Sequence, residues 1–145
     1  MKNGILPSSR CVPNNKYEEL MKIKGIIWLG TRTDRFDQMT DFCRDLLGLK
    51  QTLLEPGFAI FDLPNGDRLE IFGSEEPANK FMTHPVAGFL VDDIVAARAE
   101  MEAKGIEFIG PIEGETDDYK WTHFRAPDGF VYELTYSTSH PSIAE

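Results

Sequence analysis

Long apolar runs are missing from this 145-residue sequence, and none reaches the roughly 18 residues that a membrane-spanning helix needs. The first 20 residues also lack the apolar stretch that is typical of a secretory signal peptide. Cysteine is scarce, with only Cys11 and Cys43, and we interpret both as free thiols of a reducing compartment. These absences predict a cytoplasmic protein without a membrane partner.

Basic residues are few relative to acidic ones. The chain has 15 Lys and Arg residues against 24 Asp and Glu residues, which gives a net charge of −9 at pH 7. A surface of this sign repels nucleic-acid phosphates and anionic lipid headgroups, so we expect no nucleic-acid partner. Gly-rich phosphate loops, Ser/His/Asp nucleophile motifs and Cys/His zinc clusters are also absent as recognisable spacings.

The remaining composition is sufficient for one folded domain, because 41% of the residues are hydrophobic. Residues 1–22 include several Pro, Asn and Ser residues, which favour turns, so we predict an irregular N-terminal extension there. Regular apolar patterning then continues to residue 137, which leaves residues 138–145 as a C-terminal tail. We therefore predict a single domain over residues 23–137.

The first half of this domain has a regular order of elements. Branched and aromatic residues over 22–33 predict a strand, and apolar residues at helical spacing predict a helix that ends at Gly48. Three short apolar runs, separated by turn residues, then predict three strands at residues 51–55, 58–63 and 68–73. The expected order is βαβββ.

The same order recurs in the second half, with a strand over residues 85–93, an alanine-rich helix closed by Gly105 and three more strands. At an offset of 63 residues, the hairpins over 60–74 and 123–137 share a P-[DN]-G turn and a glutamate at the same distance beyond it. Unrelated hairpins would share the turn but not the glutamate. We therefore infer an internal duplication.

Two such modules, with the stretches FCRDLLGL, VDDI and FRAPDGFVYEL, resemble the vicinal oxygen chelate superfamily. This superfamily includes glyoxalase I, the bleomycin and fosfomycin resistance proteins and the extradiol dioxygenases. The resemblance implies an α+β fold of two tandem βαβββ modules, at about residues 23–76 and 84–137. Their curled, mostly antiparallel sheet would form a cup with helices on its convex face and the ligand on its concave face. The resemblance also implies a homodimer, and we expect the final strands of the two modules to lie side by side.

Alternation along the strands identifies the side chains on the concave face. In the last hairpin the odd-numbered residues Trp121, His123 and Glu133 are expected there, and a three-residue loop would set His123 opposite Glu133. By the repeat, Ile60 and Glu70 take the equivalent places. We predict His123 as a general base with Glu133 as its partner in catalysis. The predicted ligand-binding residues are Trp28, Arg32, Glu70, Phe72, Trp121 and Arg125.

Metal-dependent members of the superfamily that this chain resembles take one ligand, usually histidine, from the first strand of each module and one glutamate from the last. The last-strand positions hold Glu70 and Glu133, but Trp28 and Val86 occupy the first-strand positions and cannot coordinate a metal ion. We therefore expect no cofactor in the usual site. An alternative is a divalent metal held by a shifted set of ligands, whose chemistry suits Zn²⁺, Fe²⁺ or Mn²⁺: Glu70, Glu133, His123 and His84.

The leading hypothesis for function is a glyoxalase/bleomycin-resistance-like protein that binds a small organic ligand in the cup without the usual metal. His123 and Glu133 would supply acid/base chemistry, for example a proton shift next to a carbonyl. One alternative is a metal-dependent lyase or dioxygenase of the same superfamily that uses the shifted ligands. Another is a non-catalytic module that sequesters its ligand.

Overall fold

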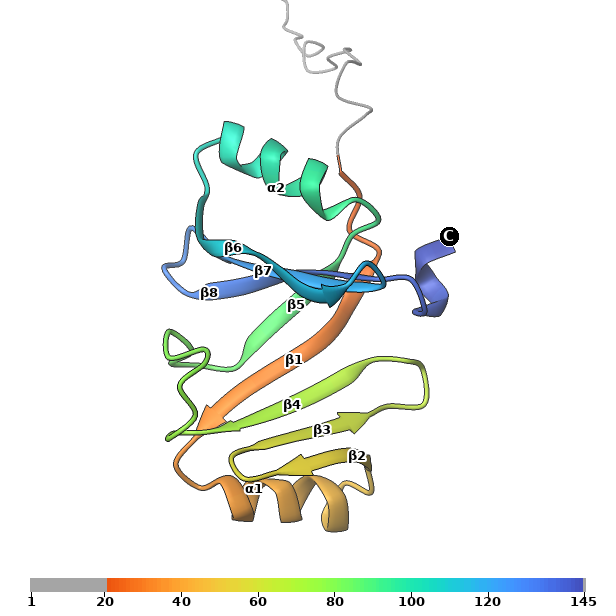
Figure 1. Cartoon of the computed structure of the whole chain (residues 1–145), viewed down its shortest axis with the longest axis vertical. Coiled ribbons are helices and arrows are strands. Elements are labelled where there is room, and N and C mark those ends of the chain that lie inside the picture. Colours follow the sequence, from red (N-terminus) through yellow and green to blue (C-terminus); the bar gives the residue numbers. More distant parts are fainter. Residues whose placement is uncertain (1–20, 145) are drawn as a thin grey trace, which may run out of the picture.

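The computed structural model describes residues 21–144, so nearly all of the predicted N-terminal extension lies outside the described residues. Figure 1 shows two modules of the same order joined in one open sheet. The first module consists of β1 (Gly25–Thr33), α1 (Phe36–Asp41), β2 (Lys50–Glu55), β3 (Phe58–Asp62) and β4 (Arg68–Gly73). The second consists of β5 (Val86–Leu90), α2 (Ile94–Ala103), β6 (Glu107–Thr116), β7 (Tyr119–Arg125) and β8 (Val131–Ser137). The predicted α+β fold of two βαβββ modules is confirmed.

The two modules join through their first strands. The strand order is β2-β3-β4-β1-β5-β8-β7-β6, with β1 and β5 antiparallel to each other. The prediction that the final strands lie side by side is therefore wrong. The reason is that β4 already uses both of its edges, since it pairs with β3 on one side and, in parallel, with β1 on the other. The remaining free edge of β1 is the one that accepts β5.

The register of the hairpins agrees with the sequence analysis. His123 pairs with Glu133 between β7 and β8, and Ile60 pairs with Glu70 between β3 and β4. Glu70 lies beside Gly30 of β1, and Glu133 lies beside Gly88 of β5. The two glutamates therefore occupy equivalent places on either side of the central strand pair.

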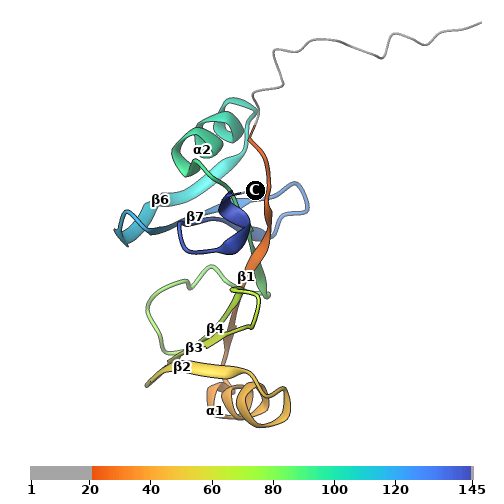
Figure 2. The same cartoon turned by 90° about the vertical axis from the view of Figure 1, so that its right-hand side faces the viewer.

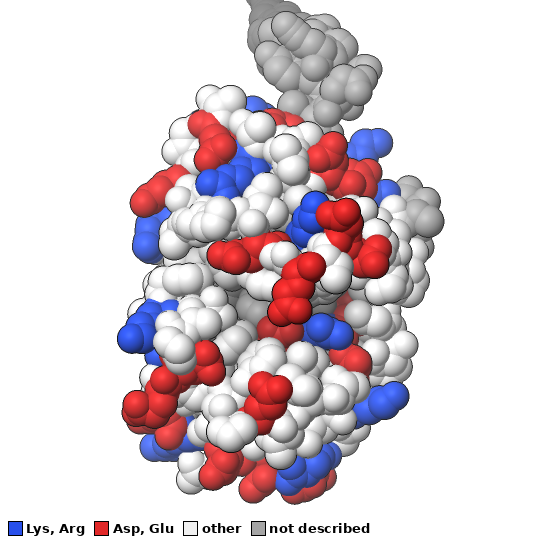
Figure 3. All heavy atoms as spheres, in the orientation of Figure 1, with Lys and Arg blue, Asp and Glu red and all other residues white. Residues whose placement is uncertain are grey.

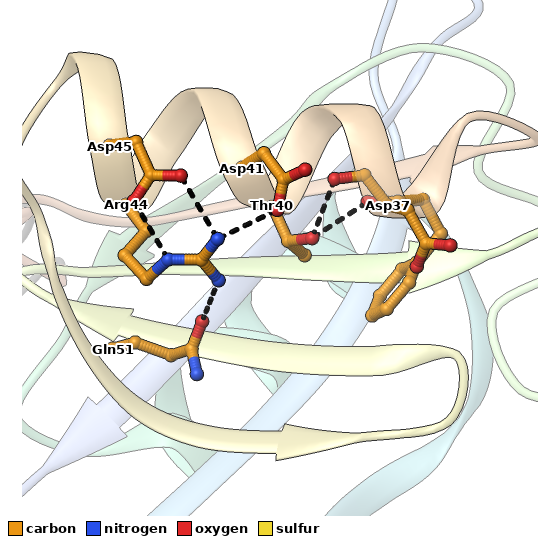
Figure 4. A network of polar contacts seen from close by, with 7 residues as sticks. Asp37, Thr40, Asp41, Arg44, Asp45 and Gln51 are labelled. Atoms are coloured by element: carbon orange, nitrogen blue, oxygen red, sulfur yellow. Dashed lines mark hydrogen bonds and ion pairs between the residues drawn. The ribbon is translucent and has the colours of Figure 1, made fainter.

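The two helices differ in regularity. The Asp93 side chain caps α2 by accepting a hydrogen bond from the Ala96 N–H at 2.9 Å. The predicted first helix is shorter, because α1 ends at Asp41 and continues as a π-helical turn, Phe42–Leu46, in which the Leu47 N–H donates to the Phe42 carbonyl. Figure 4 shows how Arg44 on this turn contacts Asp41, Asp45 and Gln51, which links the helix to β2.

Each helix covers the outer side of its own module (Figures 1 and 2). Cys43 is fully buried in one cluster with Phe61 and Ile71, and it is a free thiol, as we interpret it from the sequence. Ile94 and Ala97 of α2 pack against the second module. This arrangement leaves the inner side of the curled sheet free of helices, as the resemblance implies.

The C-terminal tail contacts the first module. It forms the short 3-10 helix η4 (Pro141–Ala144), and Nε2 of the buried His140 lies 2.8 Å from Oδ1 of Asp67 in the β3–β4 turn. Within residues 21–144, no helix is long and apolar enough to cross a membrane. The cytoplasmic location stays a prediction.

Candidate functional site

The inner side of the sheet encloses a cavity of about 830 Å³ between the two modules. Strands from both modules line it, and the loop between β4 and β5 contributes Ala78, Asn79 and Phe81. The predicted concave-face residues that line the cavity are Trp28, Ile60, Glu70, Phe72, Trp121, His123 and Glu133.

Aromatic rings make up much of the cavity wall. Phe58 and Phe72 stack with their ring centroids 5.1 Å apart, on adjacent strands of the first module. Tyr119 and Trp121 follow each other on one face of β7, with centroids 5.9 Å apart. Such walls suit a flat or apolar ligand.

His123 on β7 and Glu133 on β8 form a buried pair in the cavity wall. The Nε2 atom of His123 lies 2.9 Å from Oε2 of Glu133, and the two residues are 5% and 2% exposed. Apart from this contact, Nε2 makes no hydrogen bond with a side chain or backbone group between residues 21 and 144. Burial raises the pKa of Glu133, while His123 and the Thr135 hydroxyl, which donates to Oε1 at 2.6 Å, lower it.

Glu70 is the second ionisable group of the cavity. Burial raises the pKa of Glu70, and the neighbouring charge of Glu133 adds to that rise. Arg68, whose Nη1 lies 3.8 Å from Oε2 of Glu70, and Trp28 offset part of the rise, and the resulting pKa is about 7. A carboxyl group that titrates near neutral pH can both accept and donate a proton in that range.

Trp28 occupies the middle of the sheet, between the two glutamates. Its indole lies over Gly30, where a Cβ atom would meet indole carbons at 2.0 to 2.8 Å. A Cβ on Gly88 would meet Cβ of Trp28 at 3.0 Å and Oε1 of Glu133 at 3.1 Å. Both glycines are therefore required for the indole and the carboxylates to lie this close to the central strands.

The residues of the cavity do not fit the divalent metal that the resemblance implies for the usual site. An indole and the buried aliphatic Val86 take the places of the two first-strand ligands, and neither offers a donor atom. Over residues 21–144 there is no group of three or more His, Cys, Asp or Glu side chains placed to hold an ion.

The shifted set of ligands is not brought together either, because His84 lies elsewhere. His84 is exposed in the loop before β5. The centroid of its ring lies 4.4 Å from the centroid of the Phe130 ring. His84 is therefore not among the residues that line the cavity with Glu70, Glu133 and His123. The physical reason is that His84 precedes β5, so strand alternation does not fix its direction.

Two predicted ligand-binding arginines also lie outside the cavity lining. Arg32 donates to the carbonyl oxygens of Ala78 and Ser74 at 2.7 and 2.6 Å, and so holds the loop between β4 and β5. Arg125 shares the face of His123, but it lies at the end of β7, where it donates to the Gly129 carbonyl at 2.9 Å. Strand alternation identified the face correctly but not the position along the strand.

Some lining residues were missed by the sequence analysis. Tyr119 shares the alternation of Trp121 and His123, so that pattern was sufficient to find it. Phe81 lies in the loop between the modules, and its ring meets the His123 ring edge-on with the two centroids 4.7 Å apart. No periodic signal marks a loop residue, so only the structure could reveal it.

Comparison with known proteins agrees with this architecture. The family model described as Glyoxalase/Bleomycin resistance protein/Dioxygenase superfamily matches residues 25–134. The chain matches none of the curated proteins compared with it.

Several solved structures are similar to this chain at low sequence identity. The Mn(II)-bound glyoxalase from Novosphingobium aromaticivorans has a TM-score of 0.66 and 19% identity over 82% of this chain, which spans 40% of that glyoxalase. A methylmalonyl-CoA epimerase in complex with methylmalonyl-CoA and NH4⁺ has a TM-score of 0.61 and 17% identity, over 83% of this chain and 99% of the epimerase. A glyoxalase/bleomycin resistance protein/dioxygenase superfamily member from Vibrio splendidus 12B01 has a TM-score of 0.57 and 16% identity, over 81% of this chain and 99% of that protein. These similarities establish a common fold.

Proposed function

Because this chain belongs to the glyoxalase/bleomycin resistance protein/dioxygenase superfamily, we propose that it binds a small organic molecule in the cavity between its two modules. The observation that carries this proposal is the cavity itself, which has aromatic walls and ionisable groups at its base. Its volume of about 830 Å³ is within the range of small-molecule sites. A flat ligand could stack on the rings while its polar group faces Glu70 and Glu133.

The chemistry that these groups support is proton transfer on the bound ligand. Glu70 is the better base of the two glutamates, because its side chain is 14% exposed and that of Glu133 is 3% exposed. Glu133 instead positions His123 through the 2.9 Å contact between Oε2 and Nε2, and the imidazole ring lines the cavity, where it can donate to a ligand oxygen. We therefore assign Glu70 as the base and His123 as the donor, with Glu133 as a positioning residue. No step uses a metal.

Binding is tested with the neutral fluorescent probe 1-N-phenylnaphthylamine. The probe should emit more strongly in the presence of the protein, because the cavity removes it from water. Trp121→Ala should weaken its binding roughly tenfold, since a lost aromatic contact is worth about 0.5–1.5 kcal/mol beyond the area that it buries.

Phe130→Ala is the matched control, because Phe130 is 45% exposed and lies outside the cavity lining. This variant should bind the probe as the unaltered protein does. Equal weakening in both variants, or no binding to the unaltered protein, would contradict the proposal.

We also propose that the chain forms a homodimer. On β1, which is central in the sheet, Ile26 and Leu29 are 59% and 43% exposed, and a second copy could cover them. Light scattering at micromolar concentration should give twice the mass of the chain, and Leu29→Glu should reduce it to the monomer. Val95→Glu, which places the same charge at a 62% exposed position on α2, should leave the dimer intact. A monomeric unaltered protein would refute the proposal.

A further inference from the structure

Negative charge in the cavity is not balanced by basic side chains of the protein. Among the described lining residues four are glutamates, whereas Arg68 is the only arginine or lysine. We propose that the ligand of this cavity is an organic cation, with an ammonium group attached to a flat apolar body. This inference rests on the proposed function and names the class of ligand. The four glutamates are Glu70, Glu113, Glu115 and Glu133.

The two inner glutamates lack a cation of their own. Glu133 has His123 and the Thr135 hydroxyl as partners, and Glu70 has one distant contact with Arg68 at 3.8 Å. Two carboxylates in one desolvated cavity repel each other, and that repulsion contributes to the raised pKa of Glu70. A ligand cation between them would relieve the repulsion and favour the ionised form of both groups.

Arg68 is not free to bind an anionic ligand. Its Nε lies 3.2 Å from Oδ1 of Asp62, and its Nη1 faces Glu70. The guanidinium carbon also lies 5.6 Å from the centroid of the Tyr119 ring. One positive charge is therefore shared between two carboxylates and an aromatic face, so a ligand carboxylate or phosphate would have to compete for it.

The aromatic walls offer a second attraction for a cation. The face of an aromatic ring is electrostatically negative, and an ammonium group over such a face is stabilised most strongly by tryptophan. Trp28 and Trp121 both line the cavity, and these are the two tryptophans of the chain. The buried imidazole of His123, whose Nε2 contacts the Glu133 carboxylate, also lines the cavity.

The entrance of the cavity is also negatively charged. The last strand residues before the β6–β7 turn are acidic, since β6 continues to Thr116 and places Glu113 and Glu115 at the cavity. Figure 3 shows acidic side chains around the hollow at the middle of this face. Together with the net charge of −9, they would attract a cationic ligand and repel an anionic one.

Three probes with the same naphthalene body test which charge the cavity prefers in its ligand. They are (2-naphthylmethyl)trimethylammonium, the neutral 2-naphthalenemethanol and the anionic 2-naphthaleneacetate. Isothermal titration calorimetry at pH 8 should show the cation binding at least about tenfold more tightly than the alcohol, and the acetate most weakly. Higher salt should reduce the preference, because screening weakens the attraction of the exposed glutamates.

Variants then assign the preference to the cavity. Glu70→Gln should weaken binding of the cation roughly tenfold and leave binding of the alcohol nearly unchanged. The double variant Glu113→Gln/Glu115→Gln changes two exposed side chains and should reduce the affinity for the cation without affecting the fold. Glu107→Gln is the control on the same strand, because Glu107 is exposed and lies outside the cavity lining.

The outcomes separate this inference from the proposed function. Equal or tighter binding of the alcohol or the acetate would overturn the cationic ligand while the binding function stands. Failure of all three probes to bind would count against both. A preference for the cation that survives in Glu70→Gln and in the double variant would show that it arises outside the cavity, which also overturns the inference.

Discussion

Glu70→Gln is expected to raise the free energy of unfolding by about 3 kcal/mol at pH 8.5 and to leave it nearly unchanged at pH 4.5. The pKa of Glu70 is raised from 4.5 in the unfolded chain to about 7 in the folded protein. Each unit of this difference corresponds to about 1.4 kcal/mol. The glutamine removes the buried charge and keeps a polar side chain of similar size.

The direction in which stability changes with pH follows from proton binding. Between pH 4.5 and about 7 the folded protein holds a proton on Glu70 that the unfolded chain has released, so stability falls as pH rises through this range. Above pH 7 both states are ionised, and the full cost of the buried charge remains. Below pH 4.5 both states are protonated and the group has no effect.

Urea denaturation of the two proteins at pH 4.5 and pH 8.5 measures the effect. Glu55→Gln, at an exposed position at the end of β2, is the matched control and should show no such gain. A Glu70→Gln variant that is destabilised equally at both pH values would mean that Glu70 acts through neutral hydrogen bonds. The account of a strained buried charge would then be wrong.

Deuterium exchange at the carbon next to a ketone should depend on the same side chain. The proposed base takes a proton from that carbon, and the electron pair of the C–H bond moves to the carbonyl oxygen, which faces the His123 ring. The carboxyl proton exchanges with D₂O, and the carboxyl group then returns a deuteron to the carbon as the electron pair moves back from the oxygen. Loss of a general base typically lowers a rate about 10²- to 10⁴-fold, so Glu70→Gln should abolish most of the catalysed exchange. The rate should rise with pH through about 7 and then level off, as Glu70 becomes ionised.

Proton NMR of 1-indanone in D₂O, with and without the protein, follows this exchange. Glu55→Gln should retain the rate of the unaltered protein. A positioning role of Glu133 predicts that Glu133→Gln lowers the maximal rate, and it should also move the midpoint of the pH profile below 7, because the charge of Glu133 no longer raises the pKa of Glu70. Binding without any exchange would instead favour a protein that sequesters its ligand.

Local sequence determined the elements and the faces of their strands. The P-[DN]-G turns fix the register of each last hairpin, so Glu133 had to lie opposite His123 and Glu70 opposite Ile60. Alternation then sent these side chains to one side of the sheet. The duplication extended the argument to both modules, because equivalent turns produce equivalent faces. These predictions hold because each depends on residues close together along the chain.

Tertiary structure decided which of these side chains meet in one cavity. The pairing of β1 with β5 joins the modules and brings Glu70 and Glu133 together, and neither strand carries a local signal for that pairing. Only the structure shows that Arg125, at the end of β7, lies outside the cavity lining and that Phe81 from a loop is part of it. The raised pKa of Glu70 follows from the same assembly, since burial and the charge of Glu133 both come from distant segments. Sequence alternation fixes the direction of a side chain, whereas its neighbours and its dielectric surroundings depend on contacts between residues far apart in the chain.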